Sequence, residues 1–280
     1  MKLSNGILNV TIAEHGAELR SVIKNGTEYM WQADPKYWGK TSPILFPFVG
    51  ASLDDKYSVN GKTYKMQQHG FAREYDFELI EQSDTSAVFQ LRETDETLAI
   101  YPYKFKLLIG YKLSDNKITV SWSVVNENDC DMPFSIGAHP AFNLRPDTSF
   151  KFNTDKDITY FSIQDDGSCD ITNAKTLKND GYVPMYNGMF DTGAYVIEDN
   201  QASVVSLCDS DKKEYVSVRF TAPLFGLWHP KGNNIPFVCI EPWYGRAYKP
   251  GFDGDLFDRD YIQKLAPHST FNAEYTIEYI

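Results

Sequence analysis

Residues 105–125 read FKLLIGYKLSDNKITVSWSVV, and this stretch decides the fold class. Every second residue is apolar or aromatic from Phe105 to Leu113 and again from Ile118 to Val124. A period of two is typical of β-strands that bury one face. The pair Asp115-Asn116 supplies turn residues between the two runs, so the stretch predicts a β-hairpin of two long antiparallel strands.

Strand patterns of the same kind recur along most of the chain. Two Asn-Gly pairs, Asn25-Gly26 and Asn60-Gly61, each predict a further hairpin turn. Helical patterns are scarce, since only Thr94–Leu98 and Phe257–Leu265 predict a turn or two of helix. Residues 150–180 are polar and predict a surface loop with short strands. The other strand-like runs are residues 8–12, 19–23, 77–79, 87–91, 216–220, 237–240 and 271–280.

Length and charge limit the fold and the partners. No linker, repeat or low-complexity tract divides the 280 residues, so we expect residues 1–280 to form one domain. The strand patterns predict an all-β fold, with many antiparallel strands packed as a large sandwich. The formal net charge of −11, from 38 acidic and 27 basic residues, argues against nucleic acid and anionic membranes as partners.

The cysteines and the N-terminus bear on the cellular compartment. The four cysteines stand far apart, without a C-x-x-C pair or a metal-ligand spacing, which predicts reduced thiols and no metal site. The N-terminal MKLSNGILNV lacks the apolar segment of a secretion signal, and no run of about 18 apolar residues exists. We therefore expect a cytoplasmic protein without a membrane partner.

The stretch SIGAHPAFNL, residues 135–144, holds the first candidate for chemistry. Pro140 biases His139 towards an extended backbone, and Gly137 and Ala138 leave room for another group to approach. An imidazole in this place can exchange a proton near neutral pH. A hydrogen-bonded core histidine is the structural alternative.

The stretch CIEPWYGR, residues 239–246, holds the second candidate. Strand alternation sets Glu241 on one face with Cys239, while Val238 and Ile240 take the other face. A carboxylate at the end of an apolar strand is costly, so Glu241 is either paired structurally or held for general-base work. A strand-end glutamate and a histidine from a distant strand are a sensible acid–base pair.

Two further stretches offer binding groups. In QHGFAR, residues 68–73, His69 precedes a glycine and Arg73 carries a guanidinium that can hold two hydroxyls, a carboxylate or a phosphate. A loop histidine and a surface arginine in a salt bridge are the alternative. The aromatic and proline-rich residues 31–50 are expected to be mostly core, with one or two rings facing a sugar.

Seven motifs follow one another along the chain: GAELRSV at 16–22, SPILFPFVG at 42–50, the Asn60-Gly61 hairpin, QHGFAR at 68–73, YPYKF at 101–105, IGAHPAFNL at 136–144 and CIEPWYGR at 239–246. Each motif alone is weak, but seven in this order are specific. Together they resemble the aldose 1-epimerase (galactose mutarotase) superfamily, and within it the LacX-like branch of bacterial proteins encoded with lactose-utilisation genes. The resemblance implies a large antiparallel β-supersandwich of the galactose mutarotase-like kind.

The resemblance implies that the chain interconverts the α and β anomers of an aldose without a cofactor. His139 matches the family histidine that acts as general acid on the ring oxygen. Glu241 matches the glutamate that takes the proton from the C1 hydroxyl. His69 and Arg73 match positions that hold the sugar, and Trp243, in the same motif as Glu241, is expected to bind it as well.

The chain also departs from related LacX-like chains. It has Ala51 where they usually carry an arginine, Tyr248 where an acidic residue is common, and Gly193 where they tend to carry an aspartate. Asp191 lies close to Gly193 in the sequence and is expected to substitute in substrate binding.

Two alternatives to an epimerase of free hexoses stay open at this point. A hexose-6-phosphate 1-epimerase needs basic residues at the far end of the groove, for which Arg73, Arg246 and Lys249 are candidates. A non-catalytic carbohydrate-binding protein is favoured by Ala51 and Gly193, because a shared fold does not guarantee a shared function. In each case the partner is a small sugar or sugar phosphate, and the protein a monomer or a homodimer.

Overall fold

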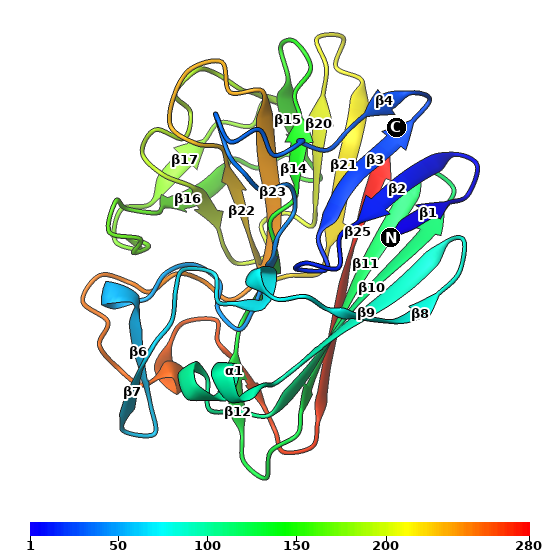
Figure 1. Ribbon diagram of the computed structural model, residues 1–280. Helices are drawn as coiled ribbons and strands as arrows, with labels where there is room; N and C mark the ends of the chain where they lie inside the picture. Colours follow the sequence, from blue (N-terminus) through cyan, green and yellow to red (C-terminus); the bar gives the residue numbers. More distant parts are fainter.

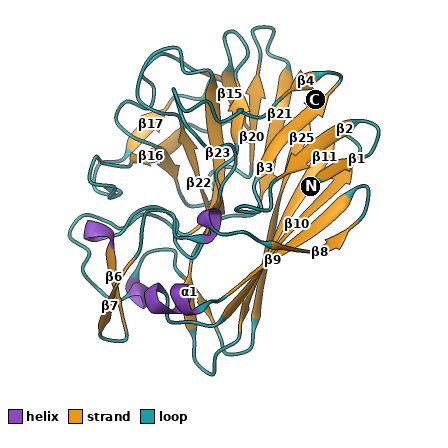
Figure 2. Cartoon of the chain, in the orientation of Figure 1, coloured by secondary structure: helices purple, strands orange, loops and turns teal.

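The computed structural model of the protein describes all 280 residues, and antiparallel strands dominate it (Figures 1 and 2). The nine-stranded sheet runs in the order β18 (Val183–Pro184), β15 (Ser149–Phe152), β20 (Val204–Cys208), β21 (Glu214–Phe220), β25 (Thr270–Tyr279), β11 (Lys117–Asn126), β10 (Phe105–Ser114), β9 (Ser86–Arg92) and β8 (Glu78–Gln82). The eight-stranded sheet runs in the order β17 (Lys175–Leu177), β16 (Ile158–Ser162), β19 (Tyr195–Ile197), β22 (Leu224–Trp228), β23 (Phe237–Tyr244), β13 (Ile136–Ala138) and β5 (Ile44–Leu45), with β14 (Ala141–Asn143) also paired to β23.

Three smaller sheets complete the fold. A four-stranded sheet contains β1 (Lys2–Ser4), β2 (Leu8–Ile12), β3 (Leu19–Lys24) and β4 (Thr27–Glu28). The two-stranded sheets are β6 (Lys56–Val59) with β7 (Lys62–Lys65), and β12 (Met132–Phe134) with β24 (Gln263–Leu265). The prediction of an all-β antiparallel fold is confirmed.

The predicted long hairpin lies in the middle of the nine-stranded sheet. The two strands β10 and β11 pair from Phe105↔Asn126 to Ser114↔Lys117. Their alternate residues enter a core of 63 buried residues to which both large sheets contribute. The Asn25-Gly26 and Asn60-Gly61 pairs likewise connect β3 to β4 and β6 to β7, so these two hairpin predictions are confirmed as well.

Helices are few, as the sequence predicts. Helix α1 (Asp95–Ile100) begins with a capping box in which the side chains of Thr94 and Thr97 bond each other's backbone N–H groups. The prediction of a helix over Phe257–Leu265 is wrong after the first turn. A 3₁₀ turn ends at Asp258, and Arg259 then turns extended because its buried guanidinium donates to the carbonyl oxygens of Val49 and Ala51.

The two faces of β23 have different surroundings. Val238 and Ile240 belong to the main core, whereas Phe237 and Cys239 belong to a small aromatic cluster on the opposite face, and Trp243 to another. Glu241 is therefore set between two small apolar clusters, on the face of the eight-stranded sheet that loops cover. This alternation confirms the strand reading of this segment.

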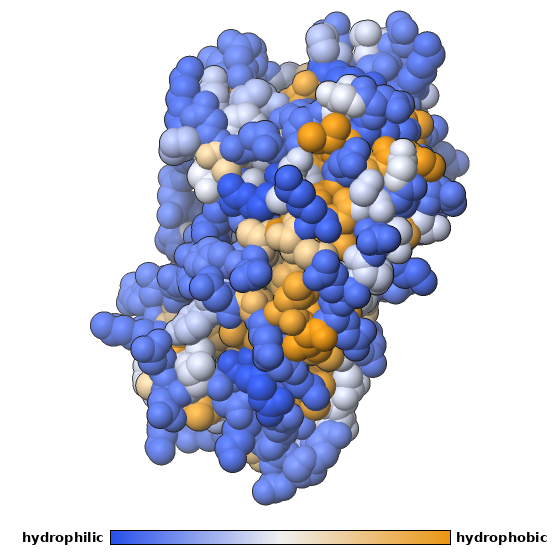
Figure 3. Space-filling view, turned by 45° about the vertical axis from the view of Figure 1, so that its right-hand side comes forward, coloured by the Kyte–Doolittle hydropathy of each residue, from blue (hydrophilic) through white to orange (hydrophobic).

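The surface and the helices bear on the expected environment. The face seen in Figure 3 is mostly hydrophilic, with a hydrophobic area near its centre. None of the helices has the length and hydropathy that crossing a bilayer requires. Two further 3₁₀ turns, Leu53–Asp55 and Ala72–Glu74, lie in the loops on either side of β6 and β7.

Two glycines leave the space that Trp243 fills. A Cβ added at Gly226 would lie 2.4 Å from the indole, and one added at Gly137 would lie 2.5 Å from it. Gly226 pairs with Glu241 across the sheet, so the missing side chain also frees room beside the carboxylate.

The substitution Gly226→Ala is expected to lower the free energy of unfolding by about 1–3 kcal/mol, because the indole has to shift in a packed site. Chemical denaturation measures the loss, and tryptophan fluorescence reports the shift. Gly39→Ala is the matched control, since a Cβ there meets nothing within 4 Å. Equal stability of the two variants would contradict this packing account.

Candidate functional site

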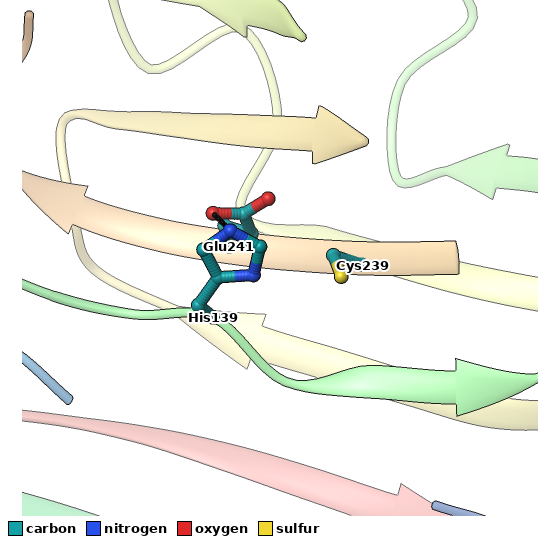
Figure 4. A group of neighbouring side chains, drawn as sticks. All are labelled: His139, Cys239 and Glu241. Atoms are coloured by element: carbon teal, nitrogen blue, oxygen red, sulfur yellow. Dashed lines mark ion pairs between the residues drawn. The ribbon is translucent and has the colours of Figure 1, made fainter. Parts of the chain in front are cut away.

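The pairing of β23 brings Glu241 to His139. Gly137 pairs with Trp243 and Ala141 with Cys239, so the same register places residue 139 opposite residue 241. His139 Nε2 lies 3.2 Å from Glu241 Oε2. Figure 4 shows the imidazole and the carboxylate turned towards each other from neighbouring segments. Residues that are distant in the sequence thus meet through one antiparallel register.

Both side chains form part of the wall of a cavity of about 440 Å³. His139 is 7% exposed and Glu241 1% exposed, so the two groups lie at the bottom of the cavity. Three of the expected binding residues, His69, Arg73 and Trp243, lie in the same wall. The volume is in the range of small-molecule sites.

Burial opposes charge on both members of the pair. Burial raises the pKa of Glu241 well above its ordinary value of 4.5, and the N–H of Trp243 offsets part of this rise. Burial, together with the positive charge of Arg73, lowers the pKa of His139 from 6.5 to about 3. Without a ligand, a carboxylic acid beside a neutral imidazole is therefore the favoured form.

His69 and Arg73 are held by loop backbone. His69 Nδ1 accepts a hydrogen bond of 3.1 Å from the Gly50 N–H. Since Nδ1 is the acceptor, the neutral ring carries its proton on Nε2. Arg73 Nη2 donates to the Gln68 carbonyl oxygen at 2.8 Å, and its Nε lies 3.2 Å from a Glu74 oxygen. Both cavity residues thus have fixed positions before a ligand binds.

Asp191 does not take the position expected of it. Its side chain is not part of the cavity wall, and its Oδ1 accepts the backbone N–H of Gly232 at 2.9 Å. Gly193 does line the cavity, but a Cβ there would lie 1.8 Å from the Ile163 carbonyl oxygen. The backbone at residue 193 leaves no space for an aspartate, and Asp191 is engaged with a neighbouring loop.

The sequence reasoning missed several residues of the wall. Trp228 could have been predicted from strand alternation. The strand β22 pairs Gly226 with Glu241, and Trp228 lies two residues further along on the same face. Lys231 and Asp165 had no such signal, since they come from loops that meet only in the fold, where Nζ and Oδ1 lie 2.6 Å apart. The missed cavity residues include Gln164, Asp165, Trp228 and Lys231, whereas Trp38 comes from the aromatic residues 31–50, of which one or two rings were expected at the site.

His139, Cys239 and Glu241 are the residues here that could hold a metal, with one ligand atom from each lying within 4.8 Å of the others (Figure 4). Cys239, however, is fully buried and is not part of the cavity wall. Burial raises the pKa of its thiol well above 9.0, which opposes the thiolate that a metal needs. The arrangement suits proton exchange between His139 and Glu241 better than metal binding.

Comparison with known proteins gives consistent results. The family model described as aldose 1-epimerase matches residues 1–248. The chain is 30% identical to the chromosomal protein LacX of Lactococcus lactis subsp. lactis over an alignment of 294 residues, which covers 99% of this chain and 98% of that one.

Solved structures are similar over the whole length. A galactose mutarotase related enzyme from Lactobacillus acidophilus is 35% identical with a TM-score of 0.93, covering 100% of this chain and 97% of that one. A galactose mutarotase-like protein from Lactobacillus casei is 27% identical with a TM-score of 0.95, covering 100% and 99%. The predicted galactose mutarotase-like fold is therefore confirmed.

The directions of the two pKa shifts predict how stability depends on pH. Between pH 4.5 and 6.5, an unfolded chain carries one proton on this pair, at His139, and the folded protein also carries one, at Glu241. The folded and unfolded forms bind the same number of protons at this pair, so the pair does not make the free energy of unfolding depend on pH in this range. In Glu241→Gln, only the unfolded chain takes up the proton at His139, so stability should fall as the pH is lowered below 6.5, by up to about 1.4 kcal/mol per unit more than in the wild type.

The variant His139→Gln should show the opposite change. Its folded form keeps the proton on Glu241 after the unfolded chain has lost it, so stability should fall as the pH rises above 4.5. Urea denaturation between pH 4.5 and 6.5 measures both slopes. Parallel curves for the wild type and the two variants would show that the pair does not hold one buried proton.

Proposed function

The chain belongs to the aldose 1-epimerase family, and from this membership we propose that it interconverts the α and β anomers of a hexose. The observation that carries the proposal is the contact between His139 and Glu241 in the wall of one cavity. Anomer exchange needs one acid and one base at the C1–O5 bond and no further chemistry. A pair of carboxylates, as in a glycosidase, is not required because no glycosidic bond breaks.

The proposed mechanism starts from the ion-pair form of His139 and Glu241. When a sugar binds, its hydroxyl groups solvate the buried pair in place of water. The proton of the carboxylic acid then crosses the 3.2 Å contact to the imidazole. Glu241 then takes the C1 hydroxyl proton while His139 donates to the ring oxygen. The C1–O5 bond breaks, a C1 carbonyl forms, and rotation about C1–C2 followed by the reverse transfers gives the other anomer.

Burial of the pair favours ring opening in this scheme. When both protons have moved, Glu241 is a neutral acid and His139 a neutral imidazole, which is the form that the dry site prefers. The proton transfers therefore discharge an ion pair that is costly to keep in the cavity. Both groups return to their starting state after ring closure, so one pair serves repeated turnovers.

The other wall residues suit the binding of a pyranose. Two tryptophan rings, of Trp228 and Trp243, offer flat apolar surfaces for the C–H face of a sugar, whereas the Trp38 ring is stacked on His139 and Phe237. Arg73 and His69 offer N–H donors for hydroxyl groups. These contacts hold the ring while the C1–O5 edge faces the acid–base pair.

A free hexose fits the distribution of charge better than a hexose phosphate. Of the three expected phosphate ligands, only Arg73 lies in the wall. Arg246 is buried and pairs with Glu198 at 2.8 Å and with Asp260, and Lys249 Nζ lies 3.6 Å from the same aspartate. Lys231 does lie in the wall, and its amino group pairs with Asp165.

Anomer exchange can be followed by polarimetry or NMR on freshly dissolved hexoses. The wild type is expected to accelerate it over buffer, and Glu241→Gln to lose at least about 100-fold in rate, because the general base is removed. Glu274→Gln is the matched control, since that glutamate is exposed and is not part of the cavity wall. No acceleration of any hexose by the wild type would overturn the proposed function.

The two alternatives make different predictions for the same samples. A higher rate on glucose 6-phosphate than on glucose would favour the phosphate-specific enzyme, whereas the free sugar is expected to react faster. Calorimetry that detects sugar binding without any anomer exchange would favour a carbohydrate-binding protein.

A further inference from the structure

The His139 imidazole lacks the usual means of orientation. In most acid–base histidines, a hydrogen bond at the second ring nitrogen fixes the ring and its tautomer. Here Nδ1 is buried and has no hydrogen-bond partner. Nε2, which faces Glu241, has only the 3.2 Å contact with that carboxylate. Another interaction must therefore fix the plane of the ring.

Three aromatic rings pack against His139. The Trp38 indole stacks on the imidazole, with ring centroids 4.8 Å apart and an interplanar angle of 29°. Trp228 and His69 meet it edge to face, at 5.4 Å and 87° and at 5.6 Å and 85° respectively. The Trp38 contact is the one parallel stack of the three, so it defines the plane in which Nε2 points to Glu241.

Trp38 is itself held by its neighbours. Its carbonyl oxygen accepts the indole N–H of Trp31 at 2.8 Å. Its ring stacks on Phe237 with centroids 5.8 Å apart and meets Trp228 edge to face at 5.5 Å. Phe237 begins the strand that carries Glu241, so the same packing fixes both members of the acid–base pair relative to each other.

We propose that Trp38 is the positioning residue of His139: its indole face holds the imidazole plane that aims Nε2 at the reacting oxygen and stabilises the imidazolium form. The proposal rests on the proposed function, since it concerns the same acid. A ring cation lying parallel to an indole face is attracted by the negative charge of that face. The stack thereby replaces the hydrogen bond that Nδ1 lacks.

Other titratable and charged groups also face His139 and stay in place when Trp38 is changed. Glu241 and Cys239 lie on β23, and His69 and Arg73 lie on the loop before β8. The wall of the cavity adds the paired side chains of Lys231 and Asp165. Effects of a change at Trp38 are therefore measured against an unchanged set of charges.

The test compares Trp38→Leu, which keeps apolar cover but removes the ring, with Trp38→Phe, which keeps a ring. Trp38→Leu should lower kcat by about tenfold and change KM much less. The basic limb of the kcat profile against pH should move to lower pH, because the imidazolium of the sugar complex is less stable. Trp38→Phe should recover most of the loss. Tyr37→Leu is the matched control, as that ring packs on Trp31 and not on His139.

A readout without turnover keeps this proposal separate from the proposed function. Nitrogen-15 NMR of the His139 ring at neutral pH should show shifted and broadened signals in Trp38→Leu, because the ring loses its stacking partner, and wild-type-like signals in Tyr37→Leu. If the wild type fails to exchange anomers but these NMR changes occur, the function is wrong and the positioning role stands. An unchanged His139 spectrum, a loss confined to KM, or a basic limb moved to higher pH would overturn the positioning role.

Discussion

The contact of two ionisable groups away from water is the constraint on which the rest of the site depends. Neither His139 nor Glu241 keeps a charge easily at this depth, and no other ion pair neutralises either of them. Burial of the two groups is nevertheless tolerable. When the pair holds one titrating proton, and that proton is on the carboxyl group, both the imidazole and the carboxylic acid are uncharged. The fold holds the two groups 3.2 Å apart, so that this proton can move from one group to the other without a movement of the backbone.

The strand that delivers the glutamate also explains the shape of the cavity. One face of β23 enters the main core and fixes the strand, while the other face carries Phe237, Cys239 and Trp243 into two small clusters beneath the covering loops. Glu241 lies where these clusters meet. The buried guanidinium of Arg259 fixes one covering loop, because it donates to the carbonyl oxygens of residues 49 and 51. This part of the loop contributes to the cavity wall.

Much of this arrangement could be predicted from the sequence, because it depends on local periodicity. The alternation along residues 105–125 and 237–241 determines which side chains enter the core, and the turn pairs determine where hairpins close. The meeting of His139 and Glu241 could be expected only through the resemblance to a family, and their proposed roles stay predictions. Neither periodicity nor spacing relates two strands a hundred residues apart.

The parts that could not be predicted depend on loop placement or strand register. Lys231 and Asp165 meet through loops without a recognisable turn motif. Asp191 was expected to replace a sugar-binding aspartate, but a backbone amide nearby takes its carboxylate. The helix expected from Phe257 ends early because Arg259 finds buried carbonyl acceptors, a long-range interaction that outweighs local helix propensity.

The central claim is that the buried pair holds one proton, on Glu241, before a sugar binds. Infrared difference spectroscopy between the wild type and Glu241→Gln at neutral pH tests it directly. The account predicts a carbonyl stretch of a protonated carboxylic acid in the wild type that disappears in the variant. Carboxylate bands alone from Glu241, with no protonated carbonyl band, would contradict it.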